Sequence, residues 1–258
     1  MSTEPFQLAI LWPALAAGLL VTATHVPLGI QVLNRGIVFI DLAVAQVAGL
    51  GVILAGRFGF EPQGAAVQIA AFTAAIAGAL LLNWSERRWP DVQEAIIGVT
   101  FILAATGATL ALASNPHGAE HLKDLLVGQI LWVDPSALWL PALAYALLLA
   151  AWFGIGAGIG RFAFYLAFAC AVTVSVQLVG LYLVFTTLIV PALATRRIAR
   201  GRIVAAYLLG GLGYLGGLGL SIVSDLPPGP LIVWIMAAFG IALFAWTSRT
   251  PSRALRAD

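Results

Sequence analysis

The chain has 258 residues, of which 61% are hydrophobic and 9% are charged, and its formal net charge is +2. A soluble domain carries about 25% charged residues, so this composition excludes a soluble globular protein. Its single cysteine, Cys170, excludes a disulfide framework and a site built from several cysteines. Because a span needs about 20 apolar residues, we expect an all-α integral membrane protein with a bundle of about 8–9 transmembrane helices.

Nine apolar segments are candidate spans and together predict a single transmembrane domain over residues 1–258. In chain order they are Leu8–Leu33, Ile37–Gly56, Gly64–Trp84, Val92–Ser114, Ala137–Gly156, Phe162–Val176, Leu178–Ala194, Ile203–Val223 and Leu231–Trp246. The N-terminal sequence MSTEPFQLAI lacks the basic start of a signal peptide, which predicts that the first helix is retained. Gln177 and Gly180 lie either in a break between two spans or in one bent helix, and this alternative decides between nine spans and eight.

The basic residues predict the orientation of the bundle, because Lys and Arg accumulate in cytoplasmic loops. With nine spans and the loop 196–202 in the cytoplasm, Arg57 and Lys123 are the only two of 13 Lys and Arg residues on the outer side. This places the C-terminus in the cytoplasm and the N-terminus outside. Eight spans would move the N-terminus inside and weaken the charge asymmetry.

Glycines gather in the span 203–223, and small residues let helices approach closely in lipid. They are Gly210, Gly213, Gly216, Gly217 and Gly219, and Gly154 with Gly158 forms a second small-residue pair. They predict either tight packing within one subunit or a contact with a second or moving helix. The sequence has no P-loop, which favours a non-catalytic chain over one that hydrolyses nucleotide.

Few ionisable residues fall within the spans, where such groups usually face a cavity or a partner. His25, Asp41 and Glu94 fall in one broad layer of the nine-span arrangement, with Gln46 as an uncharged companion. An imidazole and two carboxylates suit a divalent transition metal such as zinc or manganese. The alternative is a buried network in which these groups satisfy one another.

A second cluster lies in the loop sequence NPHGAEHLKD, on the expected outer face. His117, Glu120 and His121 match the H-x-x-E-H pattern of a metallopeptidase, which requires both histidines on one helical turn. Pro116 and Gly118 argue against such a helix there. The cluster therefore predicts either a loop that collects a cation or the cap of an interfacial helix, 121–133.

The segment IVPALATRRIARGR carries the third feature. Pro191 is expected to kink or end its span, and Arg196, Arg197, Arg200 and Arg202 follow on the cytoplasmic side. These arginines predict either a plain positive-inside anchor or a short helix that docks onto a cytoplasmic partner.

These segments together resemble the permease subunits of the metal-ion ABC transporters, the ABC-3 family of zinc and manganese importers. The matching stretches are collinear and cover most of the chain: Pro27–Val52, Gln93–Phe101, His117–Val133, Gln177–Gly201 and Ser224–Val233.

The resemblance implies the fold of a type II ABC importer permease, working as a homodimer in a bacterial inner (plasma) membrane and in contact with lipid, with no nucleic acid. It implies a cytoplasmic ATPase on each permease and an extracytoplasmic solute-binding protein that delivers the ion. Zinc or manganese would be bound transiently as cargo, with no permanent cofactor. Asp41 and Glu94 would match the family's membrane carboxylates.

The resemblance further implies that the segment 192–202 meets the ATPase. Its coupling residues would be Ala192, Thr195, Arg196, Arg197 and Arg200.

The chain departs from the family pattern at two places. Typical members carry a histidine four residues after the membrane aspartate, where this chain has Ala45. His25 or Gln46 would then replace that ligand, or the preference would shift to a harder ion. The stretch WFGIGAGIGRFAFY is also shorter than in typical members.

Other functions stay open at this stage. A related importer would move a larger chelate, such as a cobalamin or siderophore complex. A self-contained secondary cation transporter often shows inverted repeats, and no convincing repeat of that kind is present here.

Overall fold

The computed structural model describes residues 4–61, 64–112, 128, 130–155 and 160–249. Its helices are α1 (Glu4–Arg35), α2 (Ile40–Arg57), α3 (Ala65–Arg88), α4 (Gln93–Leu112), α6 (Trp139–Ile155), α7 (Arg161–Val179), α8 (Leu181–Ala194), α9 (Arg202–Ser224) and α10 (Pro228–Arg249). Three 3₁₀ turns join them: η1 (Pro90–Val92), η2 (Ile130–Trp132) and η3 (Pro135–Ala137). Throughout these ranges the regular structure is helical, with no strand.

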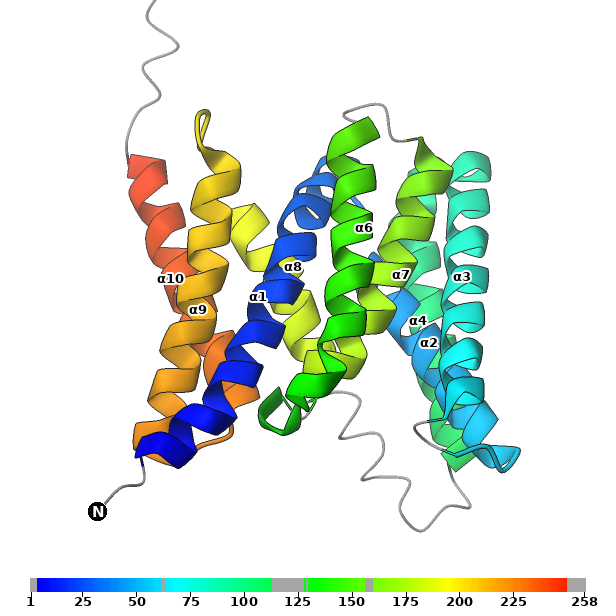
Figure 1. The fold of residues 1–258 in the computed structure, drawn as a ribbon. Coiled ribbons are helices and arrows are strands. Elements are labelled where there is room, and N and C mark those ends of the chain that lie inside the picture. Colours follow the sequence, from blue (N-terminus) through cyan, green and yellow to red (C-terminus); the bar gives the residue numbers. More distant parts are fainter. Residues whose placement is uncertain (1–3, 62–63, 113–127, 129, 156–159, 250–258) are drawn as a thin grey trace, which may run out of the picture.

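Eight helices of the described chain are long and apolar enough to cross a membrane, and α8 is a shorter apolar helix of 14 residues. The expected bundle of eight to nine spans is therefore confirmed. The helices run side by side between two ends of the bundle, with α1 starting at one end and α10 finishing at the other (Figure 1). The chain thus reverses direction at every connection, α8 included.

The chain breaks at Gly180, between α7 and α8. Gly180 has φ 85°, a backbone conformation that favours glycine because it has no Cβ. Its N–H donates to the Val176 carbonyl and its carbonyl accepts from Val184, so each helix keeps its hydrogen bonds up to the break. Of the two expected alternatives the structure has the break, and α7 extends three residues beyond the predicted end at Val176.

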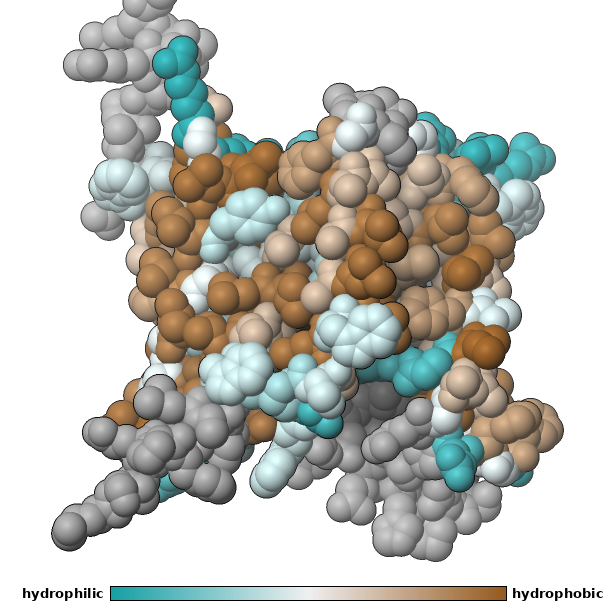
Figure 2. All heavy atoms as spheres, in the orientation of Figure 1, coloured by the Kyte–Doolittle hydropathy of each residue, from teal (hydrophilic) through white to brown (hydrophobic). Residues whose placement is uncertain are grey.

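Charged and aromatic residues mark the two ends of the bundle. We call the "basic end" the one that gathers Arg35, Arg87, Arg88, Arg161, Arg196, Arg197, Arg200 and Arg202, while Arg57 ends α2 at the opposite end. Exposed tryptophans lie near both ends: Trp12, Trp132, Trp139 and Trp234 at the opposite end, and Trp84 and Trp89 at the basic end. Such paired aromatic belts are typical of the two interfaces of a membrane. Figure 2 shows the hydrophobic surface between them.

The glycines of α9 hold the helices of one side of the bundle close together. A Cβ added at Gly217 would lie 2.4 Å from the Ile232 Cα of α10, and one at Gly210 would lie 2.7 Å from Thr22 of α1. Gly213 and Gly216 meet α10 in the same way, whereas Gly219 faces open space. The expected tight packing within one subunit is present at four of these five glycines. Gly154 has open space around it, and Gly158 lies outside the described residues.

Candidate metal path and coupling surface

Asp41 lies in the first turn of α2 and is completely buried. Both of its carboxylate oxygens lack a hydrogen-bond partner among the described residues. A charged group inside a membrane costs several kcal/mol, and the positive end of its own helix offsets about 0.3–1 kcal/mol of that, up to about 2 kcal/mol. The dipole of α2 therefore offsets only part of the cost of burying this carboxylate.

Glu94 is the second residue of α4 and is partly buried. One oxygen, Oε1, accepts a hydrogen bond from the backbone N–H of Val38, just before α2 begins. The other, Oε2, is buried without a partner in the described chain. Glu94 thus ties α4 to the start of the helix that carries Asp41, with one oxygen still available.

His25 is completely buried in the middle of α1. Its Nδ1 lies 3.0 Å from the Val21 carbonyl and 3.1 Å from the Thr24 hydroxyl. Because a carbonyl oxygen only accepts, Nδ1 carries the proton and Nε2 presents a lone pair. Nε2 has no hydrogen-bond partner in the part of the chain that is described, so it has the form of a metal-binding imidazole.

These groups do not gather into one set. Within the described residues no three His, Cys, Asp or Glu side chains lie close enough together to hold a metal ion. Gln46 is half-buried on α2, and Ala45 is 4% exposed. The expected convergence of His25, Asp41 and Glu94 is therefore absent in the described part of the chain: Glu94 is bonded to the backbone just before α2, whereas His25 is bonded within α1.

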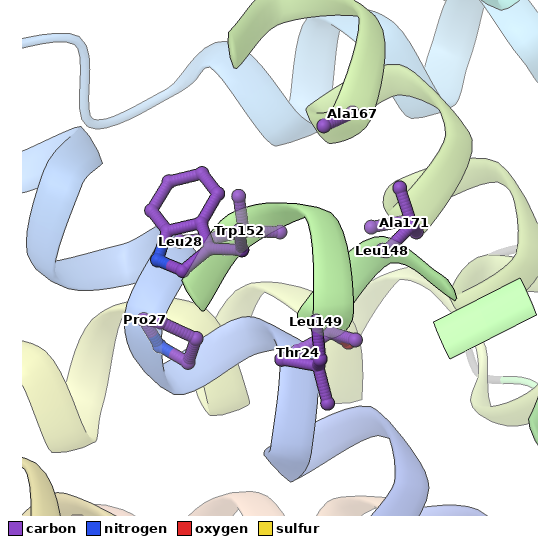
Figure 3. A pocket seen from close by; sticks show the side chains of 8 residues that line it. All are labelled: Thr24, Pro27, Leu28, Leu148, Leu149, Trp152, Ala167 and Ala171. Atoms are coloured by element: carbon purple, nitrogen blue, oxygen red, sulfur yellow. The ribbon is translucent and has the colours of Figure 1, made fainter. Parts of the chain in front are cut away.

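A small apolar cavity lies between α1, α6 and α7 (Figure 3). Thr24, Leu28, Trp152 and Ala171 are among its lining residues, and no charged side chain lines it. The cavity offers an ion no ligand beyond the Thr24 hydroxyl, which already contacts His25 and the Val21 carbonyl.

The coupling segment divides into a buried and an exposed part. Ala192 and Thr195 are completely buried: the Thr195 hydroxyl donates to the Pro191 carbonyl at 2.7 Å, and Arg202 donates to the Ala192 carbonyl at 3.2 Å. Arg196, Arg197 and Arg200 are exposed at the basic end. The first two residues therefore hold the segment in shape, whereas the three arginines are available to a partner.

An aromatic ring of α10 supports two of these arginines. The guanidinium carbons of Arg196 and Arg197 lie 5.2 and 5.4 Å from the centre of the Phe244 ring, within the range of a cation–π contact. A Cβ at Gly240, one turn earlier, would lie 2.6 Å from Val190, so α10 packs tightly on α8 at this level. The helix continues through Pro191 and ends at Ala194, so the expected end of the span at the proline is not observed.

The loop cluster His117, Glu120 and His121 lies outside the described residues, as does most of the interfacial helix expected over 121–133. The end of that stretch, residues 130–132, forms the turn η2.

A polar junction at the basic end was missed by the sequence analysis. Ser85 of α3, Gln93 of α4 and Tyr165 of α7 are buried there and bonded to one another, and Glu86 lies 3.9 Å from Arg161. The signal that was available is the polar pair Gln93–Glu94 at the start of an otherwise apolar helix.

The model of the ABC 3 transport family matches residues 7–157 and 143–247, which is most of the chain. The chain belongs to the ABC 3 transport family. Among curated relatives, the uncharacterized membrane protein slr2045 of Synechocystis sp. is 28% identical, with 90% of this chain and 89% of the relative covered. The high-affinity zinc uptake system membrane protein ZnuB of Haemophilus influenzae is 26% identical, with 89% and 94% covered.

The fold is also that of a solved structure. A chain of PsaBC from Streptococcus pneumoniae, determined in complex with a Fab, superposes with a TM-score of 0.72 at 20% identity, with 91% of both chains covered. The helical arrangement described above is therefore shared with that chain of PsaBC.

Proposed function

We propose that this chain is the permease subunit of an ATP-driven importer that moves a divalent metal ion, zinc or manganese, across a bacterial inner membrane. Its membership in the ABC 3 transport family is the observation that carries the proposal. The zinc-uptake relative favours an ion as cargo over a larger chelate. The ion is bound transiently as substrate, and the chain itself has no catalytic role.

Asp41 is the central residue of the proposed path. It combines full burial with two unpartnered oxygens, and its helix contacts α3, α4 and α7. Glu94 Oε2 and His25 Nε2 are also buried without a partner in the described chain, and Gln46 lies just over one turn beyond Asp41. Because Asp41 has no exposed area, an ion reaches it only after α2 moves relative to its neighbours. Such movement is what alternating access requires.

The partners follow from the same proposal. Two copies of the chain form the pore, a solute-binding protein supplies the ion from outside, and one ATPase docks on each basic end. The basic end then faces the cytoplasm, in agreement with the accumulation of Lys and Arg in cytoplasmic loops. This orientation puts the C-terminus inside and the N-terminus outside.

The metal path is tested by Asp41→Asn in the full complex, reconstituted in proteoliposomes with its ATPase and binding protein. We expect uptake of radiolabelled zinc or manganese to fall by at least about tenfold, because a carboxylate ligand is replaced by a neutral amide. The matched control is Asp91→Asn, since Asp91 is an exposed carboxylate in η1. Normal uptake by the Asp41→Asn complex would remove Asp41 from the path.

The coupling surface is tested by the double substitution Arg196→Ala and Arg197→Ala. We expect weaker binding of the ATPase and loss of ATP-driven uptake, while zinc or manganese binding to the permease is retained. The control is Arg57→Ala at the opposite end, whose guanidinium donates to the Ala111 carbonyl. Unchanged ATPase binding and uptake in the double variant would exclude the docking role.

A further inference from the structure

Gln93 is the centre of the polar junction at the basic end. It is 5% exposed, and Ser85 and Tyr165 are each 1% exposed. The Gln93 carbonyl Oε1 lies 2.9 Å from the Ser85 hydroxyl, and its Nε2 donates to the Leu82 carbonyl at 3.0 Å and to the Tyr165 hydroxyl at 3.3 Å. One side chain of α4 is thus bonded to both α3 and α7.

The orientation of the Gln93 amide is fixed by these partners. A carbonyl only accepts hydrogen bonds, so Nε2 must face Leu82; a flipped amide would set two carbonyl oxygens against each other. Both Nε2 hydrogens have acceptors, and Oε1 shares the single hydrogen of the Ser85 hydroxyl with the Leu82 carbonyl, each at 2.9 Å. A side chain that is satisfied on three sides cannot rotate without leaving buried polar groups unpaired, which is costly.

The next residue connects the same turn of α4 to a different helix. Glu94 accepts a hydrogen bond from the Val38 N–H just before α2 begins, while Gln93 bonds to α3 and α7. Successive residues of a helix point about 100° apart, so the two side chains hold the turn from two directions. The three-residue turn η1 directly precedes Gln93, the first residue of α4.

From this arrangement we propose that Gln93 is a positioning residue for Glu94. By bonding the first turn of α4 to α3 and α7, it holds the Glu94 carboxylate at the start of α2 with Oε2 free. The inference rests on the proposed function, in which Glu94 contributes to the ion path, and adds to that path a residue that does not touch the ion. Loss of the junction lets the turn rotate, withdraws Glu94 from Val38 and weakens ion binding.

The test uses Gln93→Leu, which keeps the approximate size of the side chain and removes its hydrogen bonds. In the reconstituted complex we expect KM for zinc or manganese uptake to rise about fivefold, the effect of losing the one hydrogen bond between Glu94 and the Val38 N–H, with kcat nearly unchanged. Amide hydrogen exchange at Val38 should become faster in the same variant. The matched control is Gln177→Leu, an exposed glutamine on α7, for which neither quantity should change.

The decisive comparison places Gln93→Leu in a Glu94→Gln background. If Gln93 acts through Glu94, Gln93→Leu does not raise KM further in a complex that already carries Glu94→Gln. An additive rise in KM, or an unchanged KM for Gln93→Leu alone, would overturn the inference while leaving the Glu94 path intact. If Glu94→Gln alone leaves uptake normal, Glu94 is not in the path and the positioning role is overturned with it; Asp41→Asn then tests the proposed function separately.

Ser85→Ala is the milder variant if Gln93→Leu fails to assemble. It removes the single donor to Gln93 Oε1, and the Glu94→Gln background should again abolish its effect on KM. A KM equal to that of the unsubstituted complex, with unchanged exchange at Val38, would argue against the proposal.

Discussion

Two contacts between helices hold opposite sides of this bundle, and they are built from opposite chemistry. Between α9 and α10, Gly213, Gly216 and Gly217 leave room for Met236, Ile235 and Ile232. Where α3, α4 and α7 meet, Ser85, Gln93 and Tyr165 fill the space with hydrogen bonds. In lipid no hydrophobic force draws helices together, so close packing and polar bonds do this work. The α9–α10 contact depends on the absence of side chains at its glycines, whereas the junction of α3, α4 and α7 depends on polar side chains that bond to one another.

The difference bears on function as well as on stability. The glycine contact contains no ionisable group and serves packing. The polar junction lies next to Glu94, so damage there reaches the proposed ion path. We therefore expect substitutions in the glycine contact to change the stability of the bundle, and substitutions in the polar junction to change ion affinity as well.

The largest effect is expected for Gly217→Ala. The added Cβ would lie 2.4 Å from the Ile232 Cα and 2.6 Å from its N, backbone atoms that cannot move aside without separating α9 from α10. Overpacking of this kind costs about 1–3 kcal/mol, measured as the free energy of unfolding in detergent. Gly219→Ala is the control, because Gly219 faces open space and alanine favours the helix. Equal stability of the two variants would contradict the tight α9–α10 contact.

A smaller effect is expected for Tyr165→Phe, which removes the hydroxyl that accepts from Gln93. Buried hydrogen bonds in membrane bundles contribute about 0.6 kcal/mol on average, and we expect a loss of stability of this order. Thermal unfolding of the variant should be compared with that of Tyr182→Phe, since Tyr182 is half-exposed on α8. If Tyr182→Phe destabilises the protein more, the junction is not a stabilising contact.

The smallest effect on the stability of the whole bundle is expected for Phe244→Leu, at the end of α10 on the glycine side, because its ring holds only an exposed segment in place. It removes the ring beneath Arg196 and Arg197, and a cation–π contact at an exposed site contributes about 0.5–1 kcal/mol. Limited proteolysis with trypsin after these arginines should become a few times faster, because the segment is held less firmly. Phe153→Leu on α6 serves as control, and equal cleavage rates in both variants would show that the ring does not restrain the segment.

Much of the fold could be predicted from the sequence. The composition required a membrane bundle, and the arginines marked one end of it before any helix was placed. The glycines of α9 predicted close helix contacts, because a glycine lets a neighbouring helix approach closely, whichever helix that is. Pro191 did not predict the end of α8, because a proline disturbs the turn before it and this helix continues through it to Ala194.

The candidate site was predictable in its members and not in its arrangement. The sequence singled out Asp41, His25 and Glu94 because they are ionisable residues within apolar spans, where such residues are rare. Their distances depend on how α1, α2 and α4 cross, which spacing along the chain does not encode. Gln93 was passed over for the same reason: its importance comes from Ser85 and Tyr165, 8 and 72 residues away.

The sequence by itself determined the solvent of this protein, the number of its spans to within one, the end that carries its arginines and the few polar groups it buries. These are properties of single residues or of short segments, and water and lipid act on them locally. The tertiary structure alone decided that the chain breaks at Gly180, that Asp41 is left without a partner, and that Gln93 binds two helices beside Glu94. Each of these depends on which surfaces meet in space, and that is set by the packing of the whole bundle.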